Sequence, residues 1–395
     1  MKKKPAVAVV GTFDSKGEEH LFLKERIHQR GLPALMINVG TKSPSPFPPD
    51  IDLFEEIRKE NPSSRDQAIE ATIQKAREIV RRLHSQEKIS GIISAGGGTG
   101  THLATSIMRV LPLGVPKVMV STVASRDMKN TVGTKDITMM HSVTDILGVN
   151  SVLGKILDKA AAAVCGMAES RWQPVEEKKC IALTMFGFIT PAAEAVRPRL
   201  EAMGYEVVAF HANGTGGTAM EELAREGHFH GILDLATHEL ADELKQGYCR
   251  GMGPERLEPS GIPRLVVPGG LDCAVLEFTR DNIPAEYRDR KIFFYDFRSA
   301  IRLSDKETLF LAEQLAAKLN RDPARVKVLI PLRGWSEADQ VDGPLFDPAM
   351  NEVFLRRLKK GLDPSVEIRE ANFHINDPGF ARLAAEIMDG MIRQS

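Results

Sequence analysis

The sequence predicts an α/β protein of two Rossmann-like, doubly wound domains with mainly parallel sheets. Short apolar runs typical of buried parallel strands alternate with segments of helical period, and this alternation stops at a polar stretch and then begins again. The chain of 395 residues is also longer than most domains that are built around a single hydrophobic core. Ligands of such sheets bind at the carboxyl ends of the strands, so we expect a ligand cleft there or between the domains.

The polar stretch 170–179 marks the expected domain boundary, which gives a nucleotide-binding domain over 1–169 and a second domain over 180–395. A capping box at Ser15 is expected to open the first helix, and 142–169 is expected to be one long helix. Thr190 and Pro191 should open a helix that Pro198 kinks or divides. The expected strands are 7–10, 34–39, 91–94, 117–121, 136–140, 180–186, 206–210, 231–235, 265–267, 291–295, 326–330 and 366–369.

The composition is that of a globular protein and excludes several function classes. Lys and Arg number 52 against 53 Asp and Glu, without the basic stripe that binding to nucleic acid or an anionic membrane needs. The apolar runs are too short for a signal peptide or a membrane span. Cys165, Cys180, Cys249 and Cys273 are scattered without a CxxC pair, as reduced thiols are. We expect a cytoplasmic protein with no nucleic-acid or membrane partner.

Three loops rich in glycine and hydroxyl side chains follow predicted strands of the first half. Consecutive glycines let the backbone approach an anion, and the N–H groups at the start of the next helix favour negative charge. Lys16 could neutralise phosphate, and Asp14 or Asp136 could hold Mg²⁺ or its water. The candidate nucleotide-binding residues are Gly11, Thr12, Asp14, Lys16, Gly17, Gly96, Gly97, Gly98, Thr99, Gly100, Thr101, Ser121, Thr122 and Gly133.

These loops match no standard nucleotide-binding motif. The chain contains no GxxxxGK[ST], and the segment 96–101 lacks the third glycine of GxGxxG. The glycines could therefore serve only to tighten the turns between strand and helix. The four glycines among the five residues 96–100, with threonines beside them, favour phosphate binding over that alternative.

The second half contains one match to the dinucleotide-binding fingerprint. Gly214, Gly216 and Ala219 satisfy G-x-G-x-x-A, and Asp234 lies about twenty residues further on, where a ribose-binding acid belongs. However, the motif follows the second strand of its half rather than the first. A second anion site, or a turn facing the cleft, is therefore favoured over a nicotinamide cofactor.

Four titratable residues of the second half come just after predicted strands: His211, His238, Asp272 and His374. If they meet in one cleft, they could act as general acids and bases or as metal ligands. Taken singly, each is better explained as a helix cap or a loop contact, but the four together favour a shared site because all lie just beyond predicted strand ends. Trp335 could stack on a base, but a packing role is favoured.

Several segments, taken in order, resemble one protein family. They are VVGTFDSKGE (9–18), AGGGTGT (95–101), STVAS (121–125), DITMM (136–140), FHANGTGG (210–217), DLATHEL (234–240), VPGGLD (267–272) and FHINDP (373–378). The sequence is identified as a member of the family of the N-terminal, ATP-binding domain of the tomato mosaic virus resistance protein, which has many bacterial members. The resemblance covers essentially the whole chain. It implies two Rossmann-like subdomains, ATP binding and a homodimer, and it brings no catalytic assignment.

The leading hypothesis is therefore an ATP-binding protein, with phosphates at the loops that begin at Gly11 and Gly96 and the rest of the nucleotide near 121–125. One alternative is a cleft enzyme acting on a small carboxylated or phosphorylated metabolite through His211, His238, Asp272 and His374. A second is an NAD-dependent oxidoreductase that uses the turn 214–219. A third is a binding module in which the nucleotide only stabilises a dimer.

Overall fold

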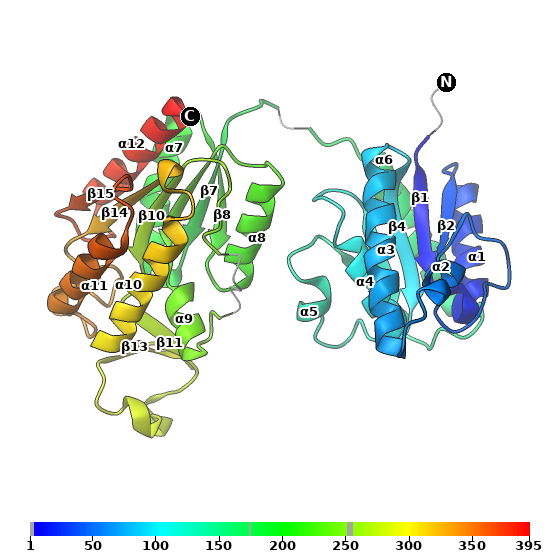
Figure 1. Ribbon diagram of the computed structural model, residues 1–395, viewed down its shortest axis with the longest axis horizontal. Coiled ribbons are helices and arrows are strands. Elements are labelled where there is room, and N and C mark those ends of the chain that lie inside the picture. The colour runs from blue at the N-terminus through cyan, green and yellow to red at the C-terminus, as the bar shows by residue number, and fades with distance from the viewer. Residues whose placement is uncertain (1–3, 174, 251–255) are drawn as a thin grey trace. The chain divides into compact units, whose positions relative to one another are not determined.

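The computed structural model describes residues 4–173, 175–250 and 256–395, and the chain forms two compact units, Met1–Pro174 and Val175–Ser395. Each unit is an α/β domain with its own parallel sheet (Figure 1). We call them the first and the second domain.

The first domain has a six-stranded parallel sheet with the order β3-β2-β1-β4-β5-β6. This is the strand order of dinucleotide-binding Rossmann folds, in which the direction of strand addition reverses between the first and fourth strands while all strands stay parallel. The strands are β1 (Ala6–Gly11), β2 (Ala34–Asn38), β3 (Ile51–Asp52), β4 (Ile89–Gly96), β5 (Lys117–Ser121) and β6 (Thr138–His141). The helices are α1 (Phe13–Gln29), α2 (Phe54–Lys59), α3 (Arg65–Ser85), α4 (Gly98–Met108), α5 (Lys129–Val132) and α6 (Leu153–Glu169).

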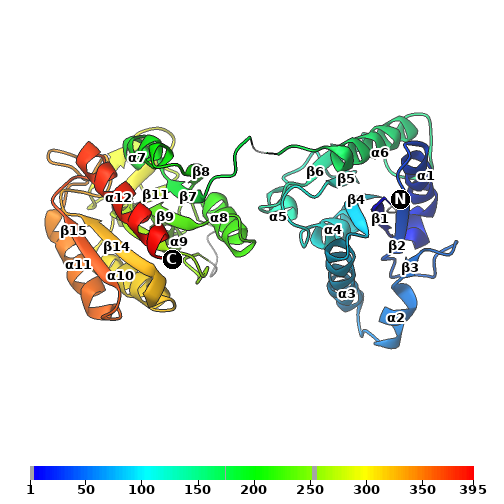
Figure 2. The ribbon, with the colours of Figure 1, turned by 90° about the horizontal axis from the view of Figure 1, so that it is seen from above.

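Helices cover both faces of this sheet, because alternate residues of each strand point to opposite sides. Val7 and Val9 of β1 pack with α1 and α6, whereas Ala8 and Val10 pack with α2, α3 and α4. Figure 2 shows α1 and α6 on one side of the sheet and α3 and α4 on the other. The continuous apolar run of β1 is thus the expected signature of a strand buried on both faces.

The second domain has a six-stranded parallel sheet with the order β15-β14-β10-β9-β7-β8 and a small antiparallel sheet, β11-β13-β12. The parallel sheet reverses between its first and third strands, β7 and β9, as flavodoxin-like sheets do. The strands are β7 (Cys180–Met185), β8 (Glu206–His211), β9 (Gly231–Ala236), β10 (Arg264–Gly269), β11 (Cys273–Leu276), β12 (Ile292–Phe294), β13 (Ser299–Arg302), β14 (Val326–Pro331) and β15 (Glu367–Ala371).

The helices of the second domain also lie on both faces of its parallel sheet. Val267 of β10 packs in the core that includes α7 and α12, and Val266 packs in the core that includes α10 and α11. The helices are α7 (Thr190–Ala202), α8 (Thr215–Arg225), α9 (Glu239–Lys245), α10 (Asp305–Leu319), α11 (Pro348–Gly361) and α12 (Pro378–Gln394). Short 3₁₀ turns are η1 (Gly187–Ile189), η2 (Arg280–Asn282), η3 (Ala285–Tyr287) and η4 (Pro323–Arg325).

The predicted fold class is confirmed, and each predicted strand is present, although 291–295 lies in the antiparallel sheet. The prediction of one long helix over 142–169 is wrong for its first part. Positive φ angles at Val143 (63°) and Gly148 (72°) keep 142–152 as a loop, and α6 begins at Leu153. Such angles do not fit a right-handed helix.

Two helix details also differ from the prediction. α1 begins before Ser15, at Phe13, and the Ser15 hydroxyl donates to Thr12 instead of capping the helix. Pro198 lies inside α7 without dividing it. A proline can sit there because tertiary packing of α7 outweighs the missing hydrogen bond.

Candidate functional site

The first domain has its topological switch point between β1 and β4, which are neighbours in the sheet. After β1 the chain enters α1 on one face, and after β4 it enters α4 on the other face. The two connections therefore separate at the carboxyl edge, which is where Rossmann sheets form the crevice that binds their ligands. Both predicted glycine-rich loops lie there (Figure 1).

In the turn after β1, protein side chains occupy the space beside the glycines. A Cβ atom at Gly11 would overlap the ring of His20, and one at Gly17 would lie 3.1 Å from the ring of Phe47. The His20 ring is fully buried; Nδ1 donates to the Lys16 carbonyl at 2.6 Å and Nε2 accepts the Ala95 N–H at 3.3 Å. Burial lowers the pKa of His20, so the ring is neutral at pH 7. Packing is a sufficient reason for both glycines.

The charged residues of this turn hold neighbouring loops. The Asp14 Oδ2 atom accepts the backbone N–H of Lys42 at 2.9 Å, and the ammonium of Lys16 donates to the carbonyl of Ile146. Thr12 accepts the hydroxyl of Ser15 at 3.1 Å. The Asp14 Oδ1 atom is buried without a hydrogen-bond partner among the described residues. Among the predicted polar residues of this turn, Asp14 is therefore the one with a buried side-chain oxygen, Oδ1, that could still bind a ligand.

The turn after β4 is different, because two of its glycines, Gly98 and Gly100, face open space, whereas Gly96 is packed against Gly100. Among the described residues, no atom lies within 4 Å of a Cβ built at Gly98 or Gly100, and neither glycine has a positive φ angle. No side chain caps α4 at Gly97 in the described structure, so the N–H groups of the first helical turn point outwards. Thr99 is exposed beside them. Neither packing nor backbone conformation explains glycine at Gly98 and Gly100.

The residues after β5 close the far side of this turn. The buried hydroxyls of Ser121 and Thr101 lie 2.7 Å apart, and Ser121 also accepts the N–H of Val123 at 3.1 Å. Thr122 donates its N–H to the carbonyl of Gly96 at 3.2 Å, and its hydroxyl lies 3.7 Å from a Cβ built at Gly97. Ser121 and Thr101 thus fix the turn, and Thr122 borders it.

Two further predicted residues lie away from the crevice. Asp136 accepts from the buried ammonium of Lys117 at 2.6 Å. Lys117 is the first residue of β5, so this pair lies at the amino edge of the sheet, opposite the crevice. The suggestion that Asp136 holds Mg²⁺ near phosphates is therefore wrong. Gly133 ends α5 with a φ of 61°, and a Cβ there would meet Arg109 at 3.1 Å.

The fingerprint turn of the second domain is filled by protein, like the turn after β1. Cβ atoms at Gly214 and Gly216 would overlap the backbone carbonyls of Arg250 and His211. Asp234, the expected ribose acid, is fully buried and paired with both Arg256 and Arg264. Burial opposes its ionisation, but the two arginines outweigh burial and lower the pKa of Asp234. The sequence match therefore does not form a dinucleotide site in this structure.

Asp234 belongs to a buried network of two arginines and three carboxylates. Arg256 also pairs with Glu221 at 3.0 Å and Glu239 at 2.9 Å, and Arg264 pairs with Glu221 at 2.7 Å. Glu239 accepts the N–H of Gly214 at 2.7 Å. The network thus ties the fingerprint turn to the end of β9. Removing one member would leave buried charges without partners.

The four predicted acid–base residues fall into two sets, and the members of each set are linked indirectly. His238 and the exposed His211 interact electrostatically, and burial together with His211 holds the pKa of His238 well below its ordinary value. Asp272 accepts the hydroxyl of Ser336 at 2.9 Å, and His374 Nε2 donates to the Ser336 carbonyl at 3.0 Å. Burial, and then Asp339, raise the pKa of Asp272 to about 7.

Their chemical availability differs. The Nδ1 atom of His374 accepts the N–H of Asn376 at 3.2 Å, so both its ring nitrogens are engaged. His238 and Asp272 are buried, which leaves His211 as the exposed member of the four. Acid–base roles for this set stay predictions.

The packing role favoured for Trp335 is confirmed. Its side chain is buried, its ring meets Phe354 edge-on with centroids 4.9 Å apart, and its indole N–H donates to the Pro331 carbonyl at 2.9 Å.

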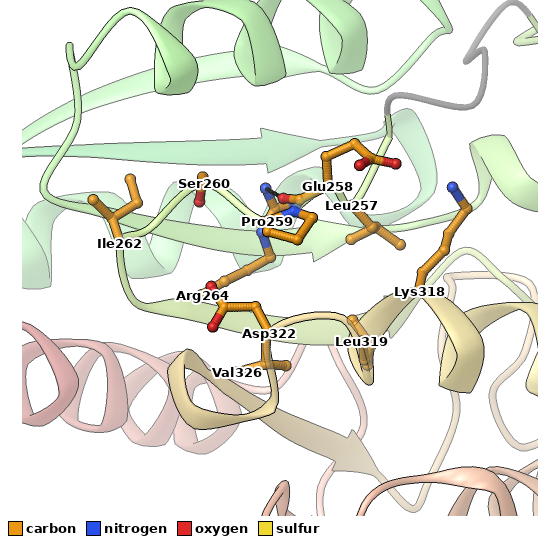
Figure 3. A pocket seen from close by; sticks show the side chains of 10 residues that line it. All are labelled: Leu257, Glu258, Pro259, Ser260, Ile262, Arg264, Lys318, Leu319, Asp322 and Val326. Carbon is orange, nitrogen blue, oxygen red and sulfur yellow. Dashed lines mark hydrogen bonds between the residues drawn. The ribbon is translucent and has the colours of Figure 1, made fainter.

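A small hollow of the second domain lies elsewhere (Figure 3). It is lined by the first residues of β10 and β14, Arg264 and Val326, and by the segment that includes Leu257 and Pro259. These strand starts form the amino edge of the sheet, whereas ligands of such sheets bind at the carboxyl edge. The guanidinium of Arg264 is also committed to Glu221 and Asp234. We therefore do not assign the candidate site to this hollow.

Sequence reasoning missed the neighbours of His238. The donor atoms of His238, Asp242 and Cys249 lie within 4.8 Å of one another, and all three residues are buried. The signal available was the spacing of His238 and Asp242, four residues apart at the start of a helix, which places them on one face. Cys249 was not found because its neighbours in the sequence carry no metal-site pattern.

The chain resembles proteins of several organisms along its length. A UPF0261 protein of Clostridium tetani is 37% identical, with 100% of each chain covered, and one of Mesorhizobium japonicum is 35% identical, with 97% and 98% covered. The ToMV resistance protein Tm-1 of Solanum lycopersicum is 33% identical over 97% of this chain and 55% of its own length. A crystal structure of UDP-N-acetylglucosamine 2-epimerase covers 92% of each chain at 12% identity, with a TM-score of 0.25.

Among the helices of the described residues, none has the length and apolar character needed to span a bilayer.

Two family models match the two domains in order. The N-terminal domain of the uncharacterised protein family UPF0261 matches residues 5–173, and the C-terminal domain of the same family matches 178–392. These matches cover nearly the whole chain, and the resemblance inferred from its loops is confirmed by the match to the tomato protein. The chain belongs to the UPF0261 family.

Proposed function

We propose that the first domain binds ATP, with its phosphates at the turn after β4. The observation that carries this proposal is the pair Gly98 and Gly100, whose missing side chains face open space at the start of an uncapped helix. Backbone N–H groups at a helix N-terminus, together with the helix dipole, stabilise phosphate. A phosphate oxygen placed against Gly98 and Gly100 would meet no side chain of the described residues.

The surroundings of the turn support a nucleotide rather than a free anion. The crevice between the ends of β1 and β4 is the position in which Rossmann sheets bind nucleotides. The segment 121–125 lies along the same edge, where the base and ribose would extend past Thr122. The neutral His20 and the engaged Lys16 place no free cation in the turn after β1, so the N–H groups of α4 carry the phosphate binding.

Asp14 fits a role toward the magnesium ion of MgATP. Its Oδ2 atom is used by Lys42, but its Oδ1 atom is buried without a partner among the described residues. A carboxylate oxygen in that state is suited to hold Mg²⁺ or a water bound to it. When bound, the ion would offset phosphate charge. Dimerisation, implied by the family resemblance, remains a prediction of the same proposal.

A thermal-shift titration tests this proposal, using ATP, ADP, AMP, NAD and NADP with and without Mg²⁺. A ligand that binds only the folded state adds about 2.7 kcal/mol at a hundred times its dissociation constant. We expect stabilisation by ATP, greater with Mg²⁺, and less by AMP because it lacks the outer phosphates. No response to any nucleotide, or a response to NAD alone, would overturn the proposal.

A further inference from the structure

The buried ring of His238 has no hydrogen-bond partner among the described residues. Neither Nδ1 nor Nε2 is paired, although the side chain is fully buried. One face of the ring stacks on Phe186, with centroids 3.6 Å apart. A buried polar group without a partner destabilises the fold, and such a group calls for an explanation such as an absent ion.

Two further metal-binding side chains lie beside this ring. Asp242 is one helical turn after His238, and Cys249 follows in the next loop; one donor atom of each residue lies within 4.8 Å of the others. Asp242 is held in place because its carboxylate accepts the N–H of Val275 and the N–H of Cys249, both at 2.7 Å. The Cys249 thiol is free of disulfide bonding. The fold thus brings a nitrogen, an oxygen and a sulfur donor close together.

We propose that His238, Asp242 and Cys249 bind a divalent transition-metal ion, with Zn²⁺ the best match. Imidazole, thiolate and carboxylate are the ligands that Zn²⁺ takes, whereas Mg²⁺ and Ca²⁺ take oxygen ligands. Tetrahedral Zn²⁺ bonds of about 2.0 to 2.3 Å require donors about 3.3 to 3.8 Å apart. Side-chain rotations that close the cluster by about 1 Å would satisfy that geometry.

The cluster also has the form of a site with an open coordination position. Three protein ligands leave the fourth position of a tetrahedral zinc ion to water or a substrate atom. Glu239, the residue after His238, is already committed to Arg256 and the N–H of Gly214, so it does not supply the fourth ligand. His211 is the exposed group that interacts electrostatically with His238.

Metal uptake by the chain 1–395 tests this proposal. The purified chain is stripped with a chelator, dialysed against Zn²⁺ or Co²⁺, and analysed for bound metal by mass spectrometry. We expect one ion per chain. The Co²⁺ form should show a thiolate-to-metal charge-transfer band and the intense visible bands of a four-coordinate ion.

Two variants separate metal binding from folding. Cys249→Ser should weaken Zn²⁺ binding by more than about a hundredfold. Even the loss of a residue that only hydrogen-bonds to a metal ligand lowers metal affinity about 10- to 100-fold, and Cys249 would be a ligand itself. The matched control is Cys180→Ser, a half-buried thiol at the start of β7, which should leave binding unchanged. His238→Phe keeps the stacking on Phe186 and removes both unpaired nitrogens. It should abolish metal binding while the metal-free protein unfolds at an equal or higher temperature.

Three results would overturn the proposal. One is a folded wild-type chain that takes up no stoichiometric Zn²⁺ or Co²⁺. Another is a Co²⁺ spectrum without a thiolate band. The third is a stoichiometric site that both Cys249→Ser and His238→Phe leave intact.

Discussion

The turns after β1 and β4 are both rich in glycine and lie at the same edge of the first sheet, yet their glycines serve different ends. Beside Gly11 and Gly17 the space for a side chain is filled by His20 and Phe47. Beside Gly98 and Gly100 it is empty among the described residues. In the first turn glycine permits close packing, and in the second it leaves backbone N–H groups accessible.

The neighbours of a glycine therefore decide its role, and the spacing of glycines alone does not. The fingerprint turn of the second domain makes the same point. It satisfies a dinucleotide pattern, but Gly214 and Gly216 are packed against backbone, and the supposed ribose acid Asp234 is paired with arginine. Phosphate binding is therefore expected at one of the three turns.

The largest expected effect concerns the network beneath the fingerprint turn. Arg256→Ala would leave Asp234, Glu221 and Glu239 buried with too few partners, and we expect it to destabilise the second domain by about 3 to 5 kcal/mol. Urea unfolding followed by the fluorescence of the buried Trp335 measures this loss.

The exposed Arg225, at the end of α8, offers a control for this prediction. Arg225→Ala should change stability by no more than about 0.5 kcal/mol. If Arg256→Ala were equally harmless, the turn would not depend on the network, and a ligand role for it would be open again.

A smaller effect is expected from adding one methyl group to each turn of the first domain. Gly11→Ala forces the side chain into the ring of His20 and should cost about 1 to 3 kcal/mol, as overpacking does. Gly98→Ala meets no atom among the described residues and should be neutral or slightly stabilising. Calorimetry of the full chain measures both, and equal losses for the two variants would contradict the comparison.

The buried His20 gives the smallest effect, which depends on pH. Its folded-state pKa lies below its unfolded value because burial disfavours the charged ring, so the unfolded chain binds more protons in acid. The stability it contributes is complete above about pH 6.5 and is lost as the pH falls towards its folded pKa.

The loss from His20 should reach about 1.4 kcal/mol for each unit of pKa difference. Measured from pH 8 to pH 5, the wild type should lose more first-domain stability than His20→Gln does. If stability fell equally with pH in the two proteins, the neutral form of the His20 ring would not be what stabilises this turn.

The fold could be predicted from the sequence because strands buried on both faces, such as β1, leave continuous apolar runs. The apolar pattern predicted a helix from residue 142, but the positive φ angle at Val143 does not fit a helix, and α6 begins only at Leu153. Sequence also found the turn at Gly96 to Thr101. It could not tell that turn from the one at Gly11, because the difference lies in His20, which reaches Gly11 only in the folded domain.

In the second domain, sequence placed His238 at the end of a strand but did not find its neighbours. Asp242 and Cys249 come together with it through a helical turn followed by a loop. Likewise, the sequence around Arg256 does not predict its three carboxylate partners, which are 17 to 35 positions away. Contacts of that range depend on the packed fold.

Calorimetric titration of ATP with Mg²⁺ into the wild type and into Gly98→Val shows whether the turn after β4 holds the phosphates. Gly166→Val is the matched control, because Gly166 is also exposed in a helix of the first domain with no atom within 4 Å of its Cβ position among the described residues. We predict that wild type and Gly166→Val bind ATP with the same affinity, and that Gly98→Val, still folded, loses at least about tenfold, equal to about 1.4 kcal/mol. Undiminished ATP binding by Gly98→Val would contradict the assignment of phosphate to the turn after β4.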